Sequence, residues 1–197
     1  MKYLKPAIQI ALVLVILVLI YLVYESIMEP VRFNKEKDLR EAAVIQRLKD
    51  IRSAQLAHRT VYGRFNTSLD SLIEFAKTKD LPVIKAIGNV PDTLTEAEAL
   101  KMGLVQRDTI WVSIKDSLFR DSKYPLDSLK VIPFSGGEAF KLDAGEIERG
   151  YVKVQVFEAI ANREQYMKGL NFKVWYQRQD GLKVGNMVEP STDGNWE

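Results

Sequence analysis

The sequence predicts an α+β fold that begins with a membrane-spanning helix. An uncharged apolar run covers residues 6–24. Between residues 34 and 58 the apolar side chains recur three and four positions apart, which is the spacing of an amphipathic helix. From residue 109 onward, β-branched and aromatic residues form short segments separated by turns. Because the helices precede the strands instead of alternating with them, the pattern indicates α+β and a C-terminal antiparallel sheet.

The apolar run at 6–24 is predicted to be a transmembrane helix. At ~1.5 Å per residue it spans about 28 Å, close to the ~30 Å hydrocarbon core of a bilayer. A cleaved signal peptide is the alternative, but its apolar run is shorter and ends in small residues, whereas this run leads into Tyr24 and Glu25. We therefore expect the helix to be retained in the protein.

The orientation expected for this helix places residues 1–5 in the cytoplasm as a short tail. Lys2 and Lys5 favour that side, although basic residues at 32–40 compete with them. The chain would then be a single-pass inner-membrane protein with a periplasmic C-terminal domain at 34–197. Residues 25–33 are predicted to be a juxtamembrane link, because Pro30 removes a backbone donor and disfavours a helical residue before it.

The amphipathic helix after the link carries a stripe formed by Val44, Leu48 and Ile51. Such a stripe packs either on its own domain or against a partner helix. Leu39, Val44, Leu48 and Ile51 are therefore the candidate partner-interface residues. Of these, we expect Leu48 and Ile51 to pack inside the domain, and Leu39 and Val44, nearer the membrane, to contact a partner. Gly63 is expected to end the helix.

Two further helices and five strands are predicted after Gly63. Thr67 is expected to cap a helix that ends at Lys77 and is closed by Pro82. Thr95 and Glu98 form a capping-box pattern for a helix that ends at Gly103. The predicted strands are 109–114, 130–134, 139–142, 151–157 and 171–176.

The composition argues against most kinds of chemistry. The chain has no cysteine, which excludes disulfides, thiolate metal sites and thiol nucleophiles, and it has a single histidine, His58. Of the 28 Lys and Arg residues, Lys2 and Lys5 precede the domain, so 26 basic residues face 26 acidic ones and no surplus is left for a nucleic acid. We predict no catalytic residue, no cofactor and no small-molecule substrate, with a carboxylate-based hydrolase as the less favoured alternative.

The C-terminus offers two further candidates. Asp193, Asn195 and Glu197 present oxygens at alternate positions and could contribute to a calcium site, although a solvated tail is favoured because calcium needs ~6–8 oxygens. Trp196 lies between two of them. Because burying an indole is strongly favourable, we expect Trp196 to dock on the sheet or on a partner.

Residues 47–58, followed by Tyr62-Gly63-Arg64-Phe65 and then residues 67–72, resemble type IV pilins and type II secretion pseudopilins. The resemblance covers roughly the first eighty residues and lacks the Gly-aromatic prepilin cleavage motif. It implies a pilin-like α+β domain in which a long N-terminal helix precedes an antiparallel sheet. The chain is also similar to single-pass membrane proteins of Bacteroidota that end in Gly-Asn-Trp-Glu.

Together these features predict a non-enzymatic, membrane-anchored structural component of a cell-envelope assembly, pseudopilin-like and related to secretion. Its partners would be the membrane and other proteins, in a homo- or hetero-oligomer. An assembly scaffold that pairs with other single-pass proteins is the first alternative. A periplasmic carboxylate hydrolase is the second.

Overall fold

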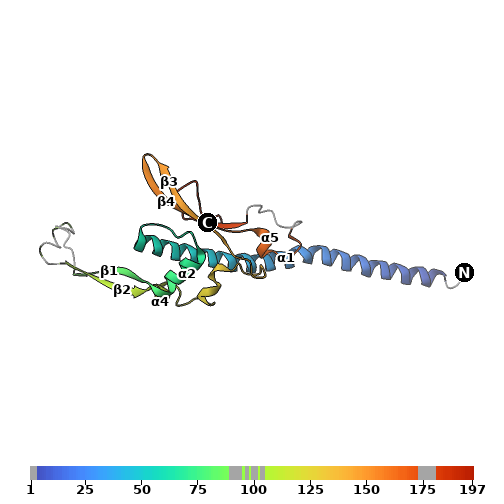
Figure 1. The fold of residues 1–197 in the computed structure, drawn as a ribbon. Helices are drawn as coiled ribbons and strands as arrows, with labels where there is room; N and C mark the ends of the chain where they lie inside the picture. Colours follow the sequence, from blue (N-terminus) through green and yellow to red (C-terminus); the bar gives the residue numbers. More distant parts are fainter. Residues whose placement is uncertain (1–3, 89–94, 96–97, 99–101, 103–104, 173–180) are drawn as a thin grey trace.

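The structure, a computed structural model, describes residues 4–88, 95, 98, 102, 105–172 and 181–197. One long helix, α1 (Leu4–Tyr62), runs through the molecule (Figure 1). Its N-terminal half projects alone, and the short helices and antiparallel sheets gather along its C-terminal half. The predicted α+β class is confirmed.

The N-terminal half of α1 is apolar and exposed from Ile8 to Tyr24. Within the described residues it is the one helix long and apolar enough to cross a membrane. No surface of the described residues covers these side chains, and a bilayer is a solvent that suits them. The structure is thus compatible with the predicted membrane anchor.

The juxtamembrane link expected at 25–33 is helical, so the prediction of a break at Pro30 is wrong. A proline inside a helix removes one backbone hydrogen bond and crowds the preceding turn, but packing on either side can hold the helix together. Here Arg32 and Glu25 form an ion pair across the proline turn, and Phe33 is buried against the domain. The helix therefore continues from the apolar segment into the domain without interruption.

The C-terminal end of α1 confirms the prediction made for Gly63. Gly63 has a φ of +73°, in the left-handed region, and its N–H donates to the Arg59 carbonyl at 2.8 Å. The next helix, α2 (Leu69–Thr78), begins one residue after Ser68, so the cap lies one position beyond the expected Thr67.

A three-stranded antiparallel sheet covers part of α1 in the order β3 (Lys141–Arg149), β4 (Val152–Ala161), β5 (Leu182–Gly185). The core-facing residues of β4 and β5 are small or apolar, and they pack with α1 and α2 in one cluster. They are Phe157, Ala159, Ala161, Leu182 and Val184. The predicted strands at 139–142 and 151–157 therefore belong to a longer hairpin, and β5 was not predicted.

A second sheet consists of two strands, β1 (Asp80–Gly88) and β2 (Val105–Ser113), which form an antiparallel hairpin that we call the β1–β2 arm. Pro82, expected to follow a helix, lies inside β1 opposite Trp111. In a two-stranded sheet each strand is an edge strand, and an edge tolerates the missing N–H of proline. Figure 1 shows the arm extending beyond the end of α1 that is far from the N-terminus.

The remaining elements are short: α4 (Ile114–Leu118), η1 (Leu126–Lys130) and α5 (Arg163–Tyr166). The strand expected at 130–134 is instead the end of η1 and a turn, with one β-bridge between Val131 and Ala139. The helix expected at 95–103 and the strand expected at 171–176 lie largely outside the described residues. The Glu98 carboxylate does accept a hydrogen bond from the Thr95 backbone N–H, which is one half of a capping box, but the Thr95 hydroxyl donates to the same carboxylate and does not accept from the Glu98 N–H.

Candidate functional site

The predicted partner-interface residues separate into two groups. Val44, Leu48 and Ile51 have 0% exposure and belong to the domain core, whereas Leu39 is 55% exposed. The expectation that Val44 contacts a partner is therefore wrong. The domain extends farther along α1 than expected, since Phe33, eleven residues nearer the membrane, is also buried. Only Leu39 of the four remains available to another molecule.

The C-terminal oxygen ligands considered for calcium do not converge. The Asp193 carboxylate accepts a hydrogen bond from Ser191, the Asn195 side chain accepts one from the Lys183 backbone at 3.1 Å, and Glu197 pairs with Arg52 at 2.8 Å. Among the residues that the structure describes, no three His, Asp or Glu side chains are grouped to hold a metal ion. Asn195 and Glu197 instead fasten the C-terminal tail to β5 and α1, whereas the Asp193 carboxylate bonds within the tail.

Trp196 packs against the core cluster, as expected for a docked indole. Gly194 forms a β-bridge with Val184 and holds the tail beside β5. The Trp196 Nε1–H is buried without a hydrogen-bond partner, so the indole contributes through apolar contact and not through its donor.

His58 is a buried structural residue near the C-terminal end of α1. Its Nδ1 lies 2.7 Å from the Arg64 carbonyl oxygen, and because a carbonyl only accepts, Nδ1 carries the proton. The rings of Tyr62 and Phe75 lie 4.8 and 4.9 Å from the imidazole. His58 thus ties the chain after Gly63 to the last turn of α1.

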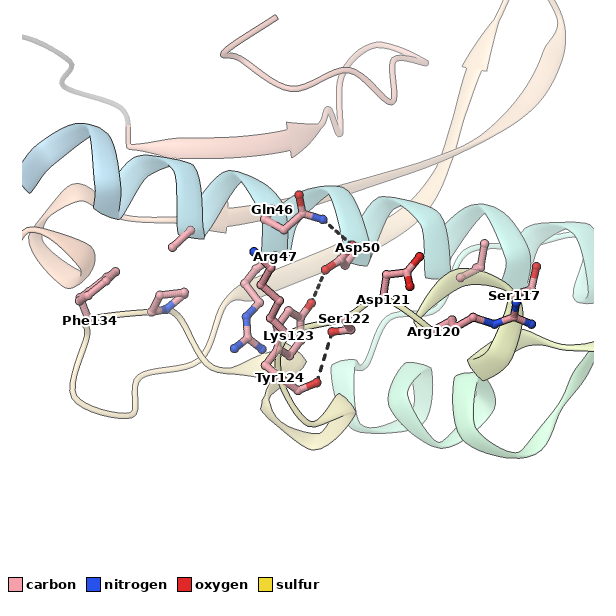
Figure 2. A pocket seen from close by; sticks show the side chains of 13 residues that line it. Gln46, Arg47, Asp50, Ser117, Arg120, Asp121, Ser122, Lys123, Tyr124 and Phe134 are labelled. Carbon is pink, nitrogen blue, oxygen red and sulfur yellow. Dashed lines mark hydrogen bonds between the residues drawn. The ribbon is translucent and has the colours of Figure 1, made fainter. Parts of the chain in front are cut away.

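A groove of about 650 Å³ lies between α1 and the segment at 117–124, and it is the candidate functional site (Figure 2). One wall is the face of α1 that carries Gln46, Arg47 and Asp50. The facing wall is the chain that leaves α4, and Pro133 and Phe134 complete the lining. The volume is in the range of ligand-binding clefts.

A hydrogen-bonded network joins the two walls. The Tyr124 hydroxyl donates to one oxygen of the Asp50 carboxylate, and Gln46 Nε2 donates to the other at 3.0 Å. Burial, followed by the bond to Asp50, raises the pKa of Tyr124 well above its ordinary value of 10.0. Both Asp50 oxygens are therefore engaged inside the protein, and Tyr124 remains a neutral donor.

Arg47 lies half-buried beside this network. Its guanidinium carbon is 3.1 Å from the centroid of the Tyr124 ring, and Nη1 donates to the Ser128 carbonyl oxygen at 2.5 Å. Desolvation by burial lowers the pKa of Arg47 from its ordinary value. In the described part of the chain, no carboxylate lies within ion-pair distance of it.

Two further cations line the groove. Arg120 and Lys123 are exposed, and within the described ranges neither makes a hydrogen bond or an ion pair to the protein. Asp121 lies between them in the sequence and is also exposed. Ala43, Leu118, Pro133 and Phe134 supply the apolar part of the lining.

Phe134 is held in an uncommon conformation at the end of the groove nearer the N-terminal half of α1. Its φ is +63°, in the left-handed region that a bulky residue rarely adopts. The ring is partly exposed and lies 5.0 Å from the Arg40 guanidinium carbon. The backbone thus presents an aromatic side chain to solvent at some conformational cost, a feature that is enriched at functional sites.

None of the groove residues was predicted from the sequence. Arg47 and Asp50 lie outside the apolar stripe of the amphipathic helix, and the segment at 117–124 carries no motif. Comparison of the chain with protein-family models, with curated proteins and with solved structures finds no match.

Proposed function

We propose that the protein is a non-enzymatic, membrane-anchored structural component of a cell-envelope assembly, related to secretion, that acts by binding other proteins. In this proposal the domain is periplasmic and the span lies in the inner membrane. The observation that carries the proposal is the continuity of α1: one helix is exposed and apolar over its first half and buries one face in the domain core over its second. A segment long and apolar enough to cross a membrane and a folded domain thereby share one continuous helix.

The β1–β2 arm supports a role in protein assembly. It is a two-stranded hairpin, a structure that is marginal in water when nothing covers it. Val83, Ile84, Ile110 and Trp111 are all exposed on it, and Trp111 is 64% exposed. Exposed apolar side chains gathered on a projecting element are typical of protein interaction sites.

The pilin-like character of the domain is part of the proposal. Its support is the sequence motif at 47–72 together with the order of a long N-terminal helix followed by an antiparallel sheet. The scaffold alternative differs from the pilin-like proposal in one respect. The apolar helix of a scaffold stays in the bilayer, whereas that of a filament subunit moves out of the bilayer into the filament. Leu39, exposed on α1 just beyond the span, is available to a neighbouring helix in either case.

Membrane fractionation combined with chemical crosslinking of the full-length chain tests the proposal. The protein should stay in the membrane pellet after carbonate washing, and crosslinking in intact membranes should convert the 22.5 kDa monomer into larger species. A protein released by carbonate, or one that remains monomeric in membranes at every crosslinker concentration, would contradict the proposal.

A further inference from the structure

We infer that the groove between α1 and residues 117–124 binds an acidic segment of a partner protein, an extended peptide that carries an apolar or aromatic side chain among its carboxylates. The inference rests on the proposed function, because it names the chemistry of the partner.

The side chains that line the groove carry more positive than negative charge. Arg47, Arg120 and Lys123 face two carboxylates, Asp50 and Asp121. Asp50 accepts hydrogen bonds at both oxygens, from Tyr124 and Gln46, but both donors are neutral, so its negative charge still acts on Arg47. Three cations against two carboxylates leave the lining with one excess positive charge. A carboxylate from a ligand offsets this charge, and Arg120 and Lys123, which make no ion pair within the described ranges, can each bind one.

Arg47 gives the groove its directional donor. A guanidinium has five N–H donors, and the one that Ser128 receives leaves others for a ligand. Contact with the Tyr124 ring and the bond to Ser128 hold the guanidinium in place, so less freedom is lost when a carboxylate binds. Because Arg47 is half-buried and, among the described residues, has no carboxylate within ion-pair distance, a carboxylate supplied from outside forms a stronger, charge-assisted bond there than at a solvated arginine.

The apolar lining and the size of the groove select a peptide over a free anion. Leu118, Pro133 and Phe134 lie along the same groove as the cations. A simple anion would fill only a small part of about 650 Å³ and would leave this apolar surface exposed. In Figure 2 the labelled side chains are spread along several turns of α1, from Phe134 at one end to Ser117 and Arg120 at the other. An extended chain of alternating acidic and apolar residues matches both the mixed lining and the length of the groove.

A pair of synthetic peptides tests the inference. The first is a fluorescein-labelled decapeptide in which Glu and Asp flank central Phe and Leu residues, and the second replaces every acid with its amide. Binding to the full-length protein in detergent is measured by fluorescence anisotropy. The acidic peptide should bind at least about tenfold more tightly than the amide peptide, and raising the salt concentration should reduce the difference.

Matched variants place this binding in the groove. The double variant Arg120→Glu, Lys123→Glu should reduce affinity for the acidic peptide about tenfold or more. The control Lys141→Glu, Lys153→Glu makes the same change in net charge on β3 and β4, outside the groove, and should bind as the unmodified protein does. Circular dichroism checks that both variants are folded.

Equal binding of the two peptides, or equal affinity of the groove and control variants, would overturn the inference. The outcome is separate from that of the proposed function. If the acidic peptide fails to bind while the protein still crosslinks to partners in membranes, the groove inference falls and the proposed function stands. If the acidic peptide binds but the protein remains monomeric in its membrane, the proposed function falls and the groove still binds acidic peptides.

Discussion

The packing of α1 on the domain can be tested by truncating two leucines of the same helix. Leu48 is fully buried and Leu39 is 55% exposed. Leu48→Ala removes about three buried carbon groups, worth ~0.8 kcal/mol each in transfer free energy, or ~2.4 kcal/mol. Incomplete collapse of the cavity adds a further term, so the expected loss is ~2–5 kcal/mol of unfolding free energy. Leu39→Ala leaves no buried cavity and should cost below ~1 kcal/mol.

Guanidinium unfolding of the full-length protein in detergent measures both effects. Trp196 packs on the core, so tryptophan fluorescence reports loss of the domain structure. The midpoint of Leu48→Ala should fall clearly below that of the unmodified protein, with an unchanged dependence on denaturant, whereas Leu39→Ala should not shift it. Equal midpoints for the two variants would refute the assignment of Leu48 to the core and of Leu39 to the free surface of α1.

Three further substitutions follow from the geometry. Gly63→Val should lower the unfolding free energy by ~1–2 kcal/mol, measured by the same assay, since φ is +73° but no atom obstructs a side chain there. Gly185→Ala should cost more than Gly63→Val, because its Cβ would lie 2.2 Å from the Phe157 carbonyl oxygen; a smaller loss would contradict this contact. Tyr124→Phe should reduce the loss of unfolding free energy above pH 10. The pKa of Tyr124 is raised in the folded state, so above pH 10 the tyrosine ionises in the unfolded chain before it ionises in the folded protein. The stability that the Tyr124 hydroxyl contributes is therefore complete below pH 10 and declines as the pH rises further. Unfolding midpoints measured from pH 9 to 12 check this, and an identical alkaline decline in both proteins would contradict it.

Local sequence signals predicted the elements that depend on local causes. The three-and-four spacing predicted the apolar stripe of α1, and Leu48 and Ile51 were correctly expected in the core, because every amphipathic helix repeats that period. Val44 is also in the core, although it was expected to contact a partner. Gly63 was found as the helix end because only glycine adopts a left-handed φ at low cost.

The errors arose where tertiary packing overrides local preference. Pro30 was expected to interrupt α1, yet the buried Phe33 and the ion pair at Arg32 hold the turns around it. Pro82 was read as a stop, whereas in β1 it occupies an edge strand, a position that periodicity does not distinguish from a loop.

The groove could not have been predicted by the same means. Its central contacts join residues far apart in the chain: Tyr124 with Asp50, 74 positions away, and Arg47 with Ser128, 81 positions away. On the helix alone, Arg47 and Asp50 have the pattern of a solvated face. Their role becomes visible only when the segment at 117–124 lies against α1.

The most direct test of the central claim, that this is a membrane-anchored protein that binds a partner protein through the groove, is photocrosslinking at Leu118 in intact cells. A benzophenone amino acid replaces Leu118 in the full-length chain, and a second version carries it at Lys141, outside the groove. We predict that the Leu118 version forms a discrete adduct with another protein in the membrane fraction, and that Arg120→Glu, Lys123→Glu abolishes it. No adduct at Leu118, or the same adducts from both positions, would contradict the account.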